Sequence, residues 1–230
     1  MTITQPPVIA FDLDGTLVDT APDLLNALDA VLEPLGIAPS DRAVARNYIG
    51  GGARLMIERA LASAGHSPAE GQISELNRLF LDHYAAHIAD GSRPYPGTVD
   101  ALERLTAQGA QLAVCTNKKE HLARILLDRL DLTRHFCVIT GGDTYAQPKP
   151  NPLPLTRTVE LAGGTLQRAV MVGDSRTDVA VARACAVPVV AVSFGYTEIP
   201  PEELGADTLI HQYDELDHAL CTLLPALQDA

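Results

Sequence analysis

The stretch "AFDLDGTLVDT", residues 10–20, combines a buried-strand pattern with a concentration of negative charge. It begins with apolar residues and then places the carboxylates of Asp12, Asp14 and Asp19 beside a glycine and two threonines. Clustered carboxylates repel one another unless a cation joins them, and hard oxygen ligands suit Mg²⁺. The stretch therefore predicts a strand that ends at a site for a divalent cation.

Other short apolar runs follow along the chain, and most of them are continuously apolar rather than alternating. This pattern is typical of strands that are buried on both faces of a parallel sheet. Helical patterns lie between the runs, so the alternation predicts an α/β fold with a doubly wound, Rossmann-like parallel sheet. The predicted strands cover residues 8–13, 110–116, 136–140, 169–174 and 188–194, with helices expected at 98–109 and 120–132.

Residues 21–92 break this alternation, because they contain helical patterns and no convincing strand. Pro22 suits the first turn of a helix, and Ser40 is a candidate N-cap. The segment "SRPYPGTV" carries two prolines and a glycine and is expected to be the return hinge. We therefore expect a helical cap over this insertion, with an α/β core formed by residues 1–20 and 93–230.

Composition excludes several classes of protein. With 230 residues, of which 47% are hydrophobic, the chain can bury a sizeable core. A net charge of −12 argues against a surface for nucleic acid or for an anionic membrane. The sequence shows no signal-peptide pattern, and no apolar run approaches the roughly 20 residues that span a bilayer. We expect a cytoplasmic protein whose scattered cysteines, at 115, 137, 185 and 221, are reduced and buried.

Chemically active side chains follow the predicted strands. Ligands of open α/β sheets bind outside the carboxyl ends of the strands. Asp12 falls at the end of the first predicted strand, Thr116 and Asn117 at the end of the second, and Asp174 at the end of the fourth. Lys149, in "QPKPN", follows the third strand after a short loop. The sequence therefore sends acids, a hydroxyl, an amide and a lysine to one edge of one sheet.

These groups suit phosphoryl transfer. An ionised aspartate is a possible nucleophile that forms an aspartyl-phosphate. A second aspartate two residues further on could protonate a leaving alkoxide and then deprotonate water. Phosphoryl transfer also needs in-line positioning and neutralised oxygens, which Mg²⁺, a lysine and small hydrogen-bond donors supply.

Four short motifs, "DLDGTLVD", "VCTNK", "PKP" and "GDSRTD", resemble the motifs of the haloacid dehalogenase superfamily in the same order. The resemblance covers the whole chain and includes a helical cap inserted after the first motif. It implies a Mg²⁺-dependent phosphatase that acts on a small phosphorylated metabolite. It also implies that Asp12 is the nucleophile and a metal ligand, that Asp14 is the general acid/base and lends its backbone carbonyl to the metal, and that Asp174 is the third ligand.

The same resemblance assigns the remaining motif residues. Thr116, with the neighbouring Asn117, resembles the phosphate-binding group, and Lys149 resembles the cation that steadies the nucleophile and the phosphoryl oxygens. Asp178 resembles a second acid that orients Lys149 or a metal-bound water. Asp19 remains open, because a carboxylate at the entry to a helix is at least as good an interpretation.

The most unusual part of the expected cap is "RNYIGGGARLMIERAL". Gly50, Gly51 and Gly52 precede a helical pattern, and a glycine-rich turn at a helix start presents free backbone N–H groups to a small anion. Arg54 and Arg46 could each add a cation. From the residues alone, a plain helix–helix turn with solvated arginines is an equally good interpretation.

Three features, "G-x-GA-x-x-L" in the expected cap, "YPG" at the return and "GDSRTD", are similar to those of the bacterial phosphoglycolate phosphatases. Members often carry another residue at Gly51. The resemblance implies hydrolysis of 2-phosphoglycolate. Four alternatives stay open: a phosphatase for a sugar phosphate, a nucleotide or pyrophosphate; a phosphomutase; a haloacid dehalogenase, which the presence of Asp14 disfavours; and a non-catalytic binding module.

Overall fold

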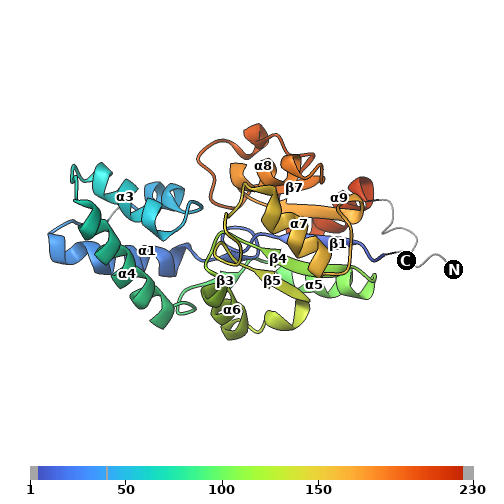
Figure 1. The fold of residues 1–230 in the computed structure, drawn as a ribbon, viewed down its shortest axis with the longest axis horizontal. Coiled ribbons are helices and arrows are strands. Elements are labelled where there is room, and N and C mark those ends of the chain that lie inside the picture. Colours follow the sequence, from blue (N-terminus) through green and yellow to red (C-terminus); the bar gives the residue numbers. More distant parts are fainter. Residues whose placement is uncertain (1–4, 40, 225–230) are drawn as a thin grey trace.

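A computed structural model describes residues 5–39 and 41–224 of the chain. Within these residues a six-stranded parallel sheet has the order β5-β4-β1-β6-β7-β8 (Figure 1). The predicted doubly wound α/β fold is therefore confirmed. The strands are β1 Val8–Phe11, β4 Gln111–Cys115, β5 Val138–Thr140, β6 Ala169–Gly173, β7 Val189–Val192 and β8 Thr208–Ile210.

Helices cover both faces of this sheet because the side chains of each strand alternate between the two. Ile9 and Phe11 pack into the core under α5, α6 and α9, whereas Val8 and Ala10 pack under α7 and α8. The central strand is thus apolar on both sides, as its continuous apolar sequence predicts. The helices are α5 Thr98–Ala107, α6 Glu120–Arg129, α7 Pro152–Leu161, α8 Arg176–Ala184 and α9 Leu216–Leu223.

A second group of helices lies beyond one end of the sheet (Figure 1). Pro22 occupies the first turn of its first helix, as predicted. Asp41 caps the second helix by accepting hydrogen bonds from the N–H groups of Ala43 and Val44, while Ser40 lies outside the described residues. The group consists of α1 Ala21–Leu32, α2 Arg42–Ala45, α3 Ala53–Ser63 and α4 Glu70–Ala86, with short 3-10 turns at Glu33–Leu35 and Arg46–Tyr48.

The chain enters and leaves this group through a two-stranded antiparallel ribbon. β2 (Val18–Asp19) pairs with β3 (Arg93–Pro94), with Val18 opposite Pro94 and Asp19 opposite Arg93. The prolines and the glycine predict a return hinge here but not the pairing, because two-residue strands carry no readable periodicity. The ribbon holds the two connections side by side.

Asp23 ties the start of α1 to the returning chain. Its side chain is 1% exposed and accepts hydrogen bonds from Gly91 N (2.8 Å), Ser92 N (2.7 Å) and Ser92 Oγ (2.6 Å). A buried carboxylate is tolerated at this place because three donors replace the water that it loses.

We expect Asp23→Ala to lower the free energy of unfolding by about 3 kcal/mol, because the backbone N–H groups of Gly91 and Ser92 lose a charged acceptor. Urea unfolding measures the loss. Asp128→Ala is the matched control, since it removes an exposed carboxylate from α6 and should change stability by less than about 0.5 kcal/mol. Equal stabilities for the two variants would contradict the role that we give to Asp23.

The four cysteines differ in their burial. All four cysteines are free thiols, but only Cys115 is fully buried and Cys137 is exposed, so the expectation of buried thiols was wrong for Cys137. Cys137 directly precedes β5 at the edge of the sheet, where less of the fold covers it. No helix within the described ranges is long and apolar enough to cross a membrane.

Candidate active site

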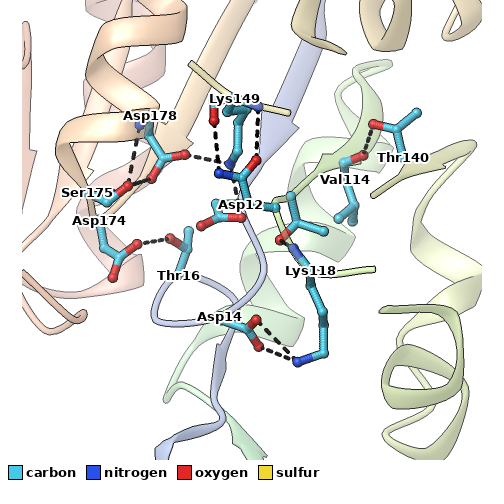
Figure 2. A network of polar contacts seen from close by, with 12 residues as sticks. Asp12, Asp14, Thr16, Val114, Lys118, Thr140, Lys149, Asp174, Ser175 and Asp178 are labelled. Carbon is cyan, nitrogen blue, oxygen red and sulfur yellow. Dashed lines mark hydrogen bonds and ion pairs between the residues drawn. The ribbon is translucent and has the colours of Figure 1, made fainter. Parts of the chain in front are cut away.

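The site residues that were predicted at the ends of the strands meet at the carboxyl edge of the sheet (Figure 2). Asp12 directly follows β1, and its backbone N–H donates to Val172 O at 2.9 Å. Thr116 directly follows β4, and Asp174 directly follows β6. Because β4 and β6 are the two neighbours of β1, these three side chains are held next to one another by the register of the sheet.

Three carboxylates form a buried acidic cluster. Asp12, Asp174 and Asp178 each offer a carboxylate oxygen, and these oxygens lie within 4.8 Å of one another. Burial, followed by the repulsion of Asp178 and Asp14, raises the pKa of Asp12 to about 6 against the opposing effect of Lys149. Burial and the charges of Asp178 and Asp12 likewise raise the pKa of Asp174. A cation among these oxygens would relieve both the repulsion and the loss of solvation.

Lys149 lies between two members of the cluster. Its side chain is 2% exposed, and Nζ lies 3.0 Å from Asp12 Oδ1 and 2.6 Å from Asp178 Oδ1. Burial lowers the pKa of Lys149, but the two aspartates outweigh this effect and raise it overall. The contact with Asp12 is an ion pair without hydrogen-bond alignment, so Asp12 Oδ1 is buried with no hydrogen bond among the described residues.

Asp178 and Asp174 are held differently. Asp178 forms a capping box with Ser175 at the start of α8: its Oδ2 accepts from Ser175 Oγ at 2.6 Å, while Oδ1 accepts from Lys149. Asp174 Oδ1 accepts from Thr16 Oγ1 at 3.3 Å, and its Oδ2 accepts from Tyr196 N at 2.6 Å. Both oxygens of Asp178 thus have short bonds, whereas Asp174 Oδ1 has only a long one, so this oxygen is better able to accept a cation.

Two glycines make room for the Asp174 carboxylate. A Cβ at Gly15 or at Gly195 would collide with the side chain of Asp174. Gly15 also has a φ of +82°, a conformation that residues with a side chain rarely adopt. The "DG" of the first motif is therefore required both by the turn after β1 and by the acid that follows β6.

Asp14 is turned toward Lys118 and away from Asp12 (Figure 2). Lys118 Nζ lies 3.0 Å from Asp14 Oδ1 and 3.2 Å from Oδ2, and it also donates to Tyr84 Oη of α4 at 2.8 Å. Lys118 belongs to the motif "VCTNK", but nothing in the sequence predicts a role for it. A lysine pair in a sequence is typical of a solvated surface, and only the fold shows that Lys118 is buried.

Asn117 is bonded to the backbone of Lys149. Its Oδ1 accepts from Lys149 N at 2.9 Å, and its Nδ2 donates to Lys149 O at 3.0 Å. The side chain of Asn117 therefore fixes the backbone position of Lys149. Thr116, which is buried, uses its Oγ1 to accept from Lys118 N at 3.2 Å. Phosphate binding by Thr116 and Asn117 stays a prediction.

Asp19 and Arg46 are joined near the ribbon. Arg46 Nη2 lies 2.8 Å and 2.9 Å from the two oxygens of Asp19, and Tyr196 Oη donates to Asp19 Oδ1 at 2.5 Å. Tyr196 Oη also accepts from Ala21 N at 2.9 Å, where α1 begins. These contacts favour the helix-entry interpretation of Asp19, and they pair Arg46 with a protein carboxylate rather than leaving it for a ligand.

A cleft of about 340 Å³ opens between the helical group and the sheet. Asp12, Asp14 and Lys118 line one side, and the loop that contains Gly51 and Gly52 lines the other. Gly52 has a φ of +87° and is the N-cap of α3. Arg54 also lines the cleft, but its guanidinium is paired with Glu58 (2.8 Å) and Glu70 (2.7 Å), so its charge is already neutralised.

The parallel sheet, the buried Asp–Lys pair and the acidic cluster together fit an α/β enzyme that transfers phosphoryl groups. Residues 9–192 match the model of the haloacid dehalogenase-like hydrolases. The chain therefore belongs to the haloacid dehalogenase-like hydrolase family.

Relatives within this family narrow the class further. A phosphoglycolate phosphatase of Mesorhizobium japonicum is 48% identical over 91% of this chain and 92% of its own. One from Agrobacterium fabrum is 46% identical over 93% and 92%. The structure of a predicted phosphoglycolate phosphatase from Haemophilus somnus has a TM-score of 0.87 at 29% identity, covering 94% of this chain and 99% of its own. CbbY from Rhodobacter sphaeroides, solved in complex with phosphate, has a TM-score of 0.77 at 27% identity, covering 92% and 96%. The chain is thus a phosphatase, a phosphoric monoester hydrolase.

Proposed function

We propose that this phosphatase hydrolyses 2-phosphoglycolate to glycolate and phosphate through an aspartyl-phosphate on Asp12. The observation that carries the mechanism is the buried Asp12 Oδ1, which has no hydrogen bond among the described residues and lies 3.0 Å from Lys149 Nζ. An acceptor without a donor, beside an ammonium, is suited to attack phosphorus. The choice of substrate rests on the names of the relatives at 46–48% identity.

The proposed reaction has two steps. A carboxylate oxygen of Asp12 attacks phosphorus, the bond from phosphorus to the glycolate oxygen breaks, and Asp14 gives that oxygen a proton. Water then attacks the same phosphorus and passes a proton to Asp14, the bond between Asp12 and phosphorus breaks, and phosphate leaves. Lys149 holds the Asp12 carboxylate in place and offsets the charge of the phosphoryl oxygens in both steps.

The acidic cluster fits a divalent cation. Asp12 and Asp174 are buried carboxylates with raised pKa values, and one oxygen of Asp12 lacks a hydrogen bond. We propose Mg²⁺, held by these two side chains and by the backbone carbonyl of Asp14, with Asp178 orienting Lys149. When bound, Mg²⁺ would supply positive charge to the phosphoryl oxygens.

We further propose that residues 21–92 act as a cap that excludes water from the cleft. Support comes from the placement of α1–α4 beyond the carboxyl edge of the sheet and from the cleft that they share with Asp12 and Asp14 (Figure 1). The ribbon of β2 and β3 is the connection about which this cap would move. By excluding water during the first step, the cap would keep water from competing with Asp12 for the phosphorus.

The cation site makes a prediction at Gly195. Gly195→Ala places a methyl group against the side chain of Asp174, so the carboxylate must shift, and we expect the Mg²⁺ concentration for half-maximal activity to rise about 10-fold or more. Gly71→Ala is the control, since nothing lies within 4 Å of a Cβ at that place in α4. A Mg²⁺ titration that is identical for Gly195→Ala and the wild type would remove Asp174 from the site.

Phosphate release from a panel of esters, with Mg²⁺ and with EDTA, tests the proposal as a whole. The panel contains 2-phosphoglycolate, a hexose phosphate, a nucleoside monophosphate, pyrophosphate and xylulose-1,5-bisphosphate, the last because it occupies the structure of a CbbY variant that is 27% identical to this chain. We expect metal-dependent release that is fastest with 2-phosphoglycolate. A preference for another ester would discard the substrate and keep the mechanism, whereas equal release in EDTA would discard the cation.

A further inference from the structure

The cationic side chains that line the cleft differ in their ion-pair partners and in their exposure to solvent. Within the described residues these are Arg54, Lys118 and Lys119. Arg54 is paired with two glutamates, and Lys119 is exposed to solvent. Lys118 is different, because it is 5% exposed and its ion-pair partner is Asp14, the residue to which we assign the proton transfers.

The ion pair between Asp14 and Lys118 is incompatible with proton transfer from Asp14 to the leaving oxygen. Both carboxylate oxygens of Asp14 lie within 3.2 Å of Lys118 Nζ. A general acid must come within hydrogen-bond reach of the leaving oxygen, so Asp14 has to leave Lys118 during turnover. A buried ammonium that loses its anion is strongly destabilised. Departure of Asp14 therefore requires a second anion that takes its place on Lys118.

We propose that the carboxylate of the substrate replaces Asp14 on Lys118, so that the released Asp14 carboxylate takes up a proton from water and gives it to the leaving oxygen. This inference rests on the proposed function, because 2-phosphoglycolate carries its carboxylate on the carbon that bears the leaving oxygen. One molecule thus supplies both the anion that frees Asp14 and the oxygen that Asp14 protonates. An ester with a neutral leaving group has no anion to exchange, and Asp14 stays on Lys118.

The surroundings of Lys118 suit such an exchange. Tyr84 Oη accepts a hydrogen bond from Nζ at 2.8 Å and keeps the ammonium directed at the cleft after Asp14 has left. Burial raises the pKa of Tyr84 to about 12, so the phenol stays neutral and does not replace the missing anion. The loop of Gly51 and Gly52 lines the facing wall of the same cleft, where a small two-carbon group would lie between the two.

The test compares kcat/KM for 2-phosphoglycolate with kcat/KM for 2-hydroxyethyl phosphate, whose leaving group is neutral and similar in size. In Lys118→Met we expect the ratio of the two to fall about 100-fold, through loss of activity on 2-phosphoglycolate, while kcat for the neutral ester rises because Lys118 no longer holds Asp14. Lys118→Arg, which keeps the charge, should keep part of the ratio. Lys119→Met is measured beside them, because it removes the neighbouring cation of the same cleft.

Each outcome decides the matter. A ratio that Lys118→Met leaves unchanged, or that only Lys119→Met lowers, overturns the exchange. A proportional fall with both esters shows that Lys118 merely supports the fold or the nucleophile, and it also overturns the exchange. If the wild type does not prefer 2-phosphoglycolate, the proposed substrate fails and the inference fails with it, whereas a preference that survives Lys118→Met defeats the inference alone.

A second measurement does not depend on how well Lys118→Met folds. Added formate should speed hydrolysis of 2-hydroxyethyl phosphate by the wild type, because formate supplies the anion that this ester lacks. Lys118→Arg should respond more weakly. Formate that slows the wild type in simple competition, with no acceleration at any concentration, contradicts the exchange.

Discussion

Asp12→Asn lowers phosphate release by roughly 10⁴-fold or more in the expected result, and the protein stays folded. An amide is a poor nucleophile toward phosphorus, and no other carboxylate in the cluster can take over. Asp178 is committed to Lys149 and Ser175, and Asp174 is held by Thr16 and the backbone of Tyr196. Steady-state assays with 2-phosphoglycolate and Mg²⁺ measure the loss.

Stability separates this loss from unfolding. Because burial raises the pKa of Asp12 from 3.8 to about 6, the ionised carboxylate lowers the stability of the metal-free fold as the pH rises through that interval. Asp12→Asn removes this contribution, so in EDTA at pH 7 its Tm should equal or exceed that of the wild type. A variant that keeps near wild-type activity, or one that is inactive because it has unfolded, would contradict the assignment.

Lys149→Met has the second large effect, and it acts on activity and stability together. It leaves Asp12 and Asp178 buried without the ammonium that lies 3.0 Å and 2.6 Å from their oxygens. Breaking a buried ion pair from one side costs about 3–5 kcal/mol of unfolding free energy. Phosphate release should fall by about 10³-fold, because a donor to the developing charge is lost.

Lys119→Met is the control for stability, since it removes an exposed lysine and should change the free energy of unfolding by less than about 0.5 kcal/mol. Urea unfolding in EDTA compares the two variants. Added Mg²⁺ should recover part of the stability of Lys149→Met, because it offsets the same carboxylates, but little of its activity. Unchanged stability of Lys149→Met would show that the cluster tolerates its charge without Lys149.

The sheet was predictable because its strands are nearly continuous in apolar residues, and five of the six were placed from the sequence with ends that differ by a few residues. β8 (Thr208–Ile210) was not, because it is three residues long and lies at the edge, where Thr208 and Leu209 are only half buried. The ribbon of β2 and β3 was not predicted either, because each of its strands is only two residues long. Short elements owe their existence to partners far away in the chain, which periodicity does not show.

The site divides in the same way. The convergence of Asp12, Thr116 and Asp174 follows from strand order and could be expected from motif positions. The partners of Asn117 and Lys118 could not be expected in this way. Asn117 is bonded to a loop 32 residues away, and Lys118 is bonded to a helix 34 residues away. The direction of a polar side chain is decided by whichever donor or acceptor the fold brings within reach, and a linear motif contains no information on that.

Tyr196 connects the acidic cluster to the entry of the helical group. Its backbone N–H holds Asp174, while its hydroxyl holds Asp19 and the first N–H of α1. Binding at the two places is then coupled if a cation in the cluster changes the orientation of α1. In that case the factor by which the cation changes the affinity for a ligand that contacts α1 equals the factor by which that ligand changes the affinity for the cation. The cation affinity, measured with and without an inert substrate analogue, would therefore report the coupling through Tyr196 between the acidic cluster and the start of α1.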